Sequence, residues 1–295
     1  MAKTPIFTGS CTAIVTPYTE TGIDFEKMGE LIDFQAENGT SALLICGTTG
    51  ENATQKLDEH AELIEFAAKH NAGRMKMIAG IGSNDTTTAH RLGQAAEDAK
   101  YDGVLMVTPY YNKTTQTGLV KHFTYVADRV NVPMVLYNVP SRTGIGIAAD
   151  TYRILSEHPN INGAKEASGD FSLFSKTRYL CGDALNIWSG NDDCTVGMIA
   201  MGAKGVISVA SNIIPQAMAD MCAAALNGDL ETAQAIHLTY ADLFSVLFVE
   251  TNPIPVKTAM NLMGMNVGKL RLPLVEMQPK NLEVLKASLE KLDLI

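Results

Sequence analysis

The chain has 295 residues, 46% of them hydrophobic, so it is long enough to bury a full core as one large domain or two smaller ones. Asp and Glu number 32 against 23 Lys and Arg, which gives a net charge of −9. An acidic surface repels phosphate backbones and anionic lipids, so we expect no binding to nucleic acid or to a membrane surface.

The five cysteines are scattered, odd in number and free of any C-x-x-C pair. This pattern argues against a disulfide framework and favours a reducing compartment. Residues 1–9 lack the apolar run of a signal peptide, and no apolar stretch reaches the roughly 18 residues that a membrane span needs. We therefore expect a cytoplasmic protein that does not cross a membrane.

Short runs of aliphatic and β-branched residues recur along the chain and are apolar almost throughout, which is typical of parallel strands covered on both faces. They predict eight strands, at residues 11–17, 42–47, 75–82, 103–109, 133–139, 161–167, 186–191 and 205–211.

The segments between these runs place apolar residues at helical spacing. Two such faces are formed by Met28, Leu31, Ile32 and Gln35, and by Leu57, Ala61, Ile64 and Ala68. Eight strands alternating with helices predict an α/β protein with a closed (β/α)8 TIM barrel; an open doubly wound sheet is the alternative.

Further helical stretches follow the eighth strand, at residues 215–226, 229–249, 254–263 and 280–291, with a proline-rich break at 252–255. We interpret residues 1–226 as the barrel, which would be the catalytic domain, and residues 227–295 as a C-terminal helical extension. The pattern does not indicate what the extension does.

In a barrel of this kind the carboxyl ends of all strands meet at one rim, where active sites are built. Lys165 lies in the predicted sixth strand. Burial disfavours an ammonium, and a neutral amine attacks ketones, so Lys165 is a candidate to form a Schiff base. The alternative is that this lysine reaches solvent or pairs with Glu166.

Other reactive side chains fall at the same rim. Tyr137, on the preceding strand, could exchange protons with an imine, or could be an ordinary core tyrosine. The turn at residues 47–51 could bind a carboxylate through its backbone N–H groups, or could be an ordinary turn. Arg142 could hold a carboxylate with its two-pronged guanidinium, or could be a surface arginine. Tyr110 and Tyr111 are adjacent and point in different directions, so at most one serves this site.

Motifs for other chemistries are missing. The sequence has neither a G-x-x-x-x-G-K-[ST] phosphate loop nor a G-x-G-x-x-G dinucleotide motif after any strand. The six histidines are dispersed, and no G-x-S-x-G nucleophile motif occurs. We expect no cofactor and no metal.

Six segments occur in order: G-T-T-G-E (47–51), P-Y-Y-N (109–112), Y-N-V-P-x-R-T-G (137–144), K-E-A-S (165–168), S-G-N-D (189–192) and G-V-I-S-V (205–209). By this set the chain resembles the dihydrodipicolinate synthases over essentially its whole length. These enzymes are pyruvate-dependent class I aldolases, a type of lyase, built on a (β/α)8 barrel. The resemblance implies condensation of pyruvate with L-aspartate 4-semialdehyde, through an imine on Lys165, to give 4-hydroxy-tetrahydrodipicolinate. This is the first committed step of diaminopimelate and lysine biosynthesis.

The resemblance also implies residue roles. Tyr137, Thr48 and Tyr111 would form a hydroxyl relay for protons, with Tyr111 supplied by a neighbouring subunit. The protein would then be at least a homodimer, and a homotetramer if two dimers assemble. Arg142 would hold the carboxylate of aspartate semialdehyde. Further pocket contacts would come from Thr49 and from the backbones of Gly190 and Ile207.

Two other functions stay open at this point. A related Schiff-base aldolase, such as N-acetylneuraminate lyase or a keto-deoxy sugar acid aldolase, would share the lysine and the tyrosine. A non-catalytic keto-acid sensor is less favoured, because every matched position keeps its reactive group.

In relatives inhibited by lysine, a cluster at the dimer interface holds the inhibitor. His60, Asn84 and Tyr110 match that cluster, while Leu57 and Thr88 replace a histidine and an acidic residue. Losing a carboxylate partner for an ammonium should weaken binding by about 1.5–3 kcal/mol, so we expect weak or absent inhibition by lysine.

Overall fold

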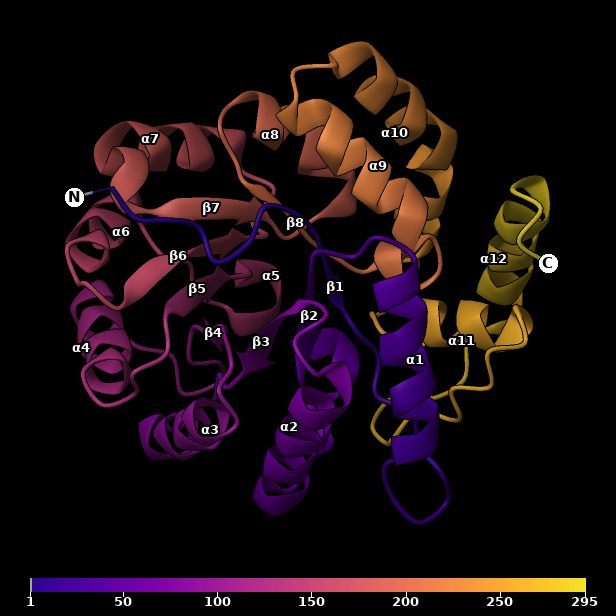
Figure 1. Ribbon diagram of the computed structural model, residues 1–295, viewed down its shortest axis with the longest axis horizontal. Coiled ribbons are helices and arrows are strands. Elements are labelled where there is room, and N and C mark those ends of the chain that lie inside the picture. Colours follow the sequence, from indigo (N-terminus) through magenta and orange to yellow (C-terminus); the bar gives the residue numbers. More distant parts are fainter. Residues whose placement is uncertain (1) are drawn as a thin grey trace.

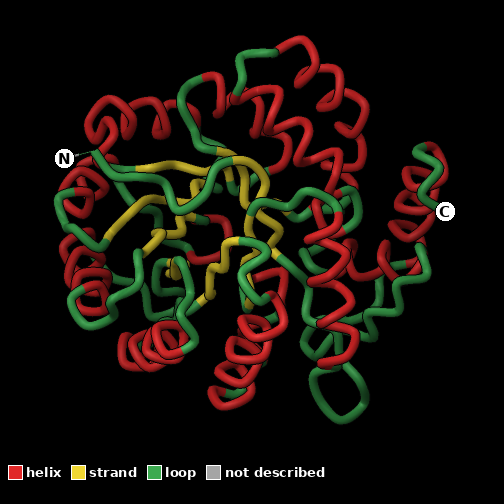
Figure 2. Tube along the Cα trace, viewed as in Figure 1, coloured by secondary structure: helices red, strands yellow, loops and turns green. Residues whose placement is uncertain are grey.

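The computed structural model describes residues 2–295. Over this range eight parallel strands close into a barrel in chain order, with the last strand beside the first (Figures 1 and 2). The strands are β1 (Gly9–Ala13), β2 (Ala42–Ile45), β3 (Lys76–Gly80), β4 (Gly103–Val107), β5 (Met134–Asn138), β6 (Ile161–Glu166), β7 (Asn186–Ser189) and β8 (Gly205–Ser208). The closed order confirms the predicted (β/α)8 barrel and excludes an open sheet.

All eight strands are shorter than the predicted runs, and β1 begins earlier, at Gly9 rather than at residue 11. The missing residues lie mainly at the carboxyl ends. There the chain leaves the sheet to form rim turns such as η1 (Thr48–Gly50) after β2 and η5 (Ala210–Asn212) after β8. Apolar composition alone does not reveal this departure from the sheet.

Twelve α-helices lie within residues 2–295. The ring around the barrel is formed by α1 (Phe25–Glu37), α2 (Leu57–Asn71), α3 (Thr86–Asp98), α4 (Gln116–Ala127), α6 (Ala149–Ser156), α7 (Phe171–Cys181), α8 (Thr195–Ala200) and α9 (Pro215–Leu226). The short helix α5 (Pro140–Thr143) directly follows β5 and lies inside this ring (Figure 1). Side chains of Asp24, Asp85, Thr115 and Asp170 accept backbone N–H bonds at the starts of α1, α3, α4 and α7, which are standard N-caps. No helix within residues 2–295 combines the length and the apolar character needed to span a bilayer.

Three further helices, α10 (Leu230–Val246), α11 (Ile254–Leu262) and α12 (Pro279–Lys291), agree with the predicted extension helices to within a few residues. Helix α10 packs against α9, and α12, yellow in Figure 1, contacts α10 and α11. Both α9 and α10 contribute to one apolar cluster, so the predicted boundary after residue 226 falls inside a packed unit. The division into residues 1–226 and 227–295 stays a prediction.

The predicted helix faces were correct for α1 and partly wrong for α2. Helix α1 buries the whole predicted face. Helix α2 instead buries a face centred on His60 and Ile64, and Leu57, Ala61 and Ala68 are only partly buried. The polar His60 ring can be buried there because its Nε2 forms a 2.8 Å hydrogen bond with a main-chain carbonyl of β3.

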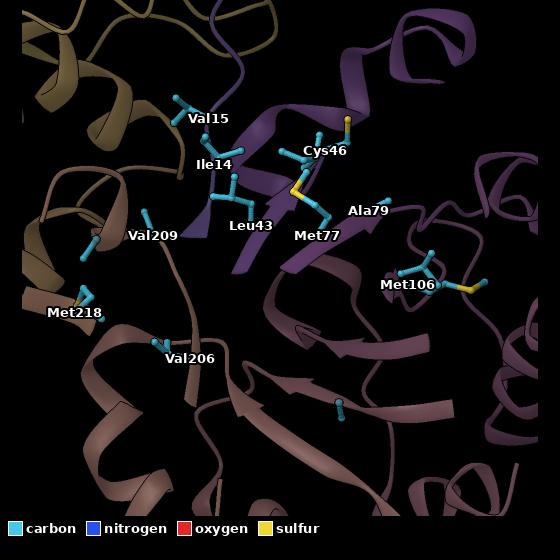
Figure 3. Close-up of a cluster of buried hydrophobic side chains, with 14 of the residues drawn as sticks. Ile14, Val15, Leu43, Cys46, Met77, Ala79, Met106, Val206, Val209 and Met218 are labelled. Carbon is cyan, nitrogen blue, oxygen red and sulfur yellow. The ribbon is translucent and has the colours of Figure 1, made fainter. Parts of the chain in front are cut away.

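Strand side chains alternate between two cores. Those pointing outward, such as Leu43, Met77 and Met106, pack against the ring helices (Figure 3). Those pointing inward fill the barrel, where Trp188 stacks on Phe7 with ring centroids 4.9 Å apart. Phe7 precedes β1 and so closes the amino-terminal end, which leaves the carboxyl ends of the strands as the place for an open site.

Candidate active site

A cavity of about 530 Å³ opens at the carboxyl ends of the strands. It brings together six of the eight predicted site residues: Thr48, Thr49, Tyr137, Arg142, Lys165 and Gly190. An adjoining cavity of about 210 Å³ shares three of these residues and also includes Tyr110. Residues that are far apart in the sequence therefore meet in one place, as convergent strand ends require.

Lys165 lies on β6, directly opposite Tyr137 of β5 in the sheet register. Its side chain is only 5% exposed, and Nζ lies 4.5 Å from the centroid of the Tyr137 ring. Among residues 2–295 no carboxylate or carbonyl accepts a hydrogen bond from this amine. Lys165 therefore combines burial, access to the cavity and the absence of a protein partner.

The neighbouring carboxylate does not pair with Lys165. Glu166 points to the opposite face of the strand, where it accepts hydrogen bonds from Asn138 Nδ2, Tyr152 Oη and the backbone N–H of Ser168. The alternative of a pair between Lys165 and Glu166 is therefore wrong, because successive side chains of a strand face opposite ways.

A second buried lysine shows that burial alone does not identify a nucleophile. Lys257 of α11 is 1% exposed and donates to Thr16 O at 3.0 Å, Glu51 Oε1 at 2.9 Å and Lys269 O at 2.8 Å. Burial lowers the pKa of Lys257, and the Glu51 carboxylate opposes that shift. Since an ammonium has three N–H donors, all of them are used here, and Lys257 is a structural cation.

Gly190 follows β7 and packs directly against Lys165. A Cβ atom at this position would lie 2.5 Å from Ala167 Cβ and 3.1 Å from Lys165 Cε. Any larger residue would press on the lysine side chain, so the glycine sets the space in which the amine lies.

The turn after β2 is anchored on both sides. Thr16 Oγ1 donates to Gly50 O at 2.7 Å, and the buried Glu51 carboxylate binds Lys257 Nζ and the backbone N–H of Arg271. Glu51 itself has a left-handed backbone with φ of +57°. The first N–H groups of a helical turn have no partner within it, so those of Thr48 and Thr49 are available to a carboxylate.

The other predicted residues occupy different places. Arg142, at the rim, is exposed overall and donates through Nη2 to the backbone oxygen of Asn252 at 3.1 Å. Tyr111 is 92% exposed and does not line the cavity. Ile207 is fully buried inside the barrel, paired with Cys11 of β1, and does not line the cavity either.

Sequence reasoning missed one wall of the site. Residues 248–252, between α10 and α11, line the same cavity as Lys165. The proline-rich break was the only signal of an irregular segment there, and it did not show where the segment packs. Within the described chain no three His, Cys, Asp or Glu side chains come together in a way that could hold a metal ion.

Comparison with known proteins agrees with this geometry. The model of the dihydrodipicolinate synthetase family matches residues 6–292. The 4-hydroxy-tetrahydrodipicolinate synthase of Thermoanaerobacter pseudethanolicus is 51% identical over 292 residues, which cover 99% of this chain and 98% of that protein.

Two solved structures are similar in fold as well as in sequence. Dihydrodipicolinate synthase from Aquifex aeolicus is 47% identical with a TM-score of 0.95, covering 98% of this chain and 99% of that one. The chloride-inhibited dihydrodipicolinate synthase from Acinetobacter baumannii, solved in complex with pyruvate, is 39% identical with a TM-score of 0.95, covering 98% and 100%. The chain therefore belongs to the dihydrodipicolinate synthetase family.

Proposed function

We propose that this chain condenses pyruvate with L-aspartate 4-semialdehyde to give 4-hydroxy-tetrahydrodipicolinate, as the first committed step of diaminopimelate and lysine biosynthesis in the cytoplasm. The observation that carries the proposal is the Lys165 amine, which is buried, has no hydrogen-bond partner among residues 2–295 and opens to a cavity beside Tyr137. The family membership supports the same reaction.

The first half of the reaction uses the lysine. The amine of Lys165 attacks the ketone carbon of pyruvate, and loss of water gives an imine. The imine draws electrons from the adjacent methyl group, which loses a proton to form an enamine. The N–H groups of Thr48 and Thr49 are suited to hold the pyruvate carboxylate meanwhile.

The second half uses the rim. The enamine carbon attacks the aldehyde carbon of the second substrate, whose carboxylate would bind the Arg142 guanidinium. The α-amine of that substrate then attacks the imine carbon, which closes the ring and releases the lysine amine. Each of these steps moves a proton, and we assign those transfers to the hydroxyls of Tyr137, Thr48 and Tyr111.

The assignment of Tyr111 requires a second subunit. Its side chain is 92% exposed and lies outside the cavity of its own chain, which is compatible with insertion into a neighbour. We therefore propose a homodimer as the active unit and a homotetramer of two such dimers. Mixing inactive Tyr111→Phe and Lys165→Ala chains should restore part of the activity in mixed dimers. Mixed dimers that form but stay inactive would place Tyr111 in the relay of its own subunit.

The reaction is tested by offering the purified protein two alternatives in parallel. Pyruvate with aspartate semialdehyde should be consumed together, whereas N-acetylneuraminate should not be cleaved. Cleavage of N-acetylneuraminate without the condensation would show a related Schiff-base aldolase. Imine formation with pyruvate but no turnover of either substrate would show a keto-acid sensor.

A further inference from the structure

The loop between α10 and α11 contributes a residue that contacts two predicted substrate-binding groups at once. Asn252 is 4% exposed and lines the cavity that contains Lys165. Its side-chain Nδ2 donates to Thr49 Oγ1 at 3.0 Å, and its backbone oxygen accepts from Arg142 Nη2 at 3.1 Å. Through Asn252 the C-terminal extension therefore contacts both Thr49, on the turn after β2, and Arg142, on α5.

The bond to Thr49 has a defined polarity. A threonine hydroxyl has one proton to donate and two lone pairs that accept. Because Thr49 Oγ1 accepts from Asn252, its own proton is not used in that bond. Within residues 2–295 the Thr49 hydroxyl makes no second side-chain hydrogen bond, so the proton is left for a ligand in the cavity.

The oxygen atom of the same Asn252 amide has a different environment. Asn252 Oδ1 is buried and has no hydrogen-bond partner among the described residues. Turning the amide over would place Oδ1 against Thr49, where it would accept the hydroxyl proton, and would leave Nδ2 at the position that has no partner. That exchange would remove the donor from the cavity. Either orientation leaves one buried polar atom of the amide without a partner among the described residues, and only the orientation with Nδ2 toward Thr49 keeps the Thr49 proton free.

We propose that Asn252 is a positioning residue for keto-acid binding, which holds Thr49 Oγ1 as an acceptor so that its proton is donated to the pyruvate carboxylate. The inference rests on the proposed function, because it takes pyruvate as the ligand at Lys165. It also gives the C-terminal extension a role in the chemistry of the barrel mouth.

Four variants test the inference: Asn252→Asp, Asn252→Ala, Thr49→Val and the double variant Thr49→Val/Asn252→Asp. The measured quantity is the pyruvate concentration that half-saturates the borohydride-trapped adduct on Lys165, so no second substrate is needed. Thermal melts show that each variant is folded. The backbone bond to Arg142 is kept in every variant, because it uses the Asn252 carbonyl of the main chain.

Asn252→Asp is nearly isosteric, but an ionised carboxylate can only accept, so it should take the Thr49 proton. The half-saturating pyruvate concentration should rise about tenfold or more, the loss expected for one hydrogen bond to a charged group. Asn252→Ala frees the hydroxyl without capturing its proton, and the rise should be smaller, about threefold. In the Thr49→Val background the additional effect of Asn252→Asp should nearly vanish.

The inference would be overturned if Asn252→Asp raised the half-saturating pyruvate concentration by the same factor in the wild-type and Thr49→Val backgrounds. A new charge or a disturbed loop would then be acting independently of the Thr49 hydroxyl. So would unchanged pyruvate dependence in both single Asn252 variants. If Asn252→Asp does not fold, the same comparison is made with Asn252→Ala, whose effect on the half-saturating pyruvate concentration is measured in the wild-type and Thr49→Val backgrounds. A wild-type protein that forms no adduct removes the proposed function as well, whereas an adduct that is insensitive to Asn252 removes only this inference.

Discussion

Gly190 leaves room for the side chain of Lys165, because a Cβ atom on Gly190 would lie 3.1 Å from Lys165 Cε. We expect Gly190→Ala to push the amine away from the cavity. Activity should fall by about a hundredfold, as for other small misplacements of a reacting group. Stability should fall by about 1–3 kcal/mol through overpacking against Ala167.

Steady-state kinetics and urea unfolding check this prediction. Gly22→Ala is the matched control, because a Cβ there meets nothing within 4 Å and its φ is not positive. Full activity in Gly190→Ala would show that the position does not constrain the lysine.

The buried pair of Lys257 and Glu51 ties the C-terminal extension to the turn that carries Thr48 and Thr49. Lys257→Met leaves the Glu51 carboxylate buried without its partner and should destabilise the protein by about 3–5 kcal/mol. The double variant Lys257→Met/Glu51→Gln should lose less, because no buried charge remains. Urea unfolding measures the loss of stability in the single and the double variant.

Replacement of Lys69, which pairs with Glu65 on the exposed face of α2, is the control and should change stability little. Equal losses in the single and double Lys257 variants would contradict the coupling.

Burial lowers the pKa of His60 to about 4, against 6.5 for the free side chain. Below pH 6.5 the unfolded chain binds a proton at this residue while the folded chain does not, so stability falls as the pH drops from 6.5 toward 4. The full effect is about 3 kcal/mol by linkage. His60→Gln keeps a donor for the Gly80 carbonyl and removes this titration, so it should reduce the slope between pH 6.5 and 4. The slope that remains is expected from His122, whose pKa burial also lowers to about 4. A slope in the variant equal to that of the wild type would assign the effect to other groups.

Lysine should inhibit weakly or not at all. The resemblance to the family places Leu57 and Thr88 where relatives inhibited by lysine have a histidine and an acidic residue, and Thr88 Oγ1 is already bonded to Asp85 at the start of α3. Binding of L-lysine should be weaker by about ten- to a hundredfold than in a chain with the acidic residue, for want of one charged hydrogen bond. Rates measured over a range of L-lysine concentrations test this, and inhibition at micromolar concentration would refute it.

The sequence predicted the barrel well, because strands covered on both faces are apolar throughout and the helices between them keep their spacing. It also predicted most of the cavity, since parallel strands bring their carboxyl ends to one rim. Lys257 and Asn252 could not be predicted in this way. Their roles depend on how the extension folds back over the barrel, and neither residue lies in a strand or at a strand end. The same limit explains α2, where a tertiary hydrogen bond allows His60 to be buried.

The most direct test of the account is reduction of the purified protein with borohydride in the presence of pyruvate, followed by peptide mapping. Lys165 and Lys257 are both buried, but only Lys257 has all its donors satisfied. The account predicts one reduced pyruvate on the peptide containing Lys165, and none in Lys165→Ala. An adduct on Lys257, or no adduct in the wild-type protein, would contradict it.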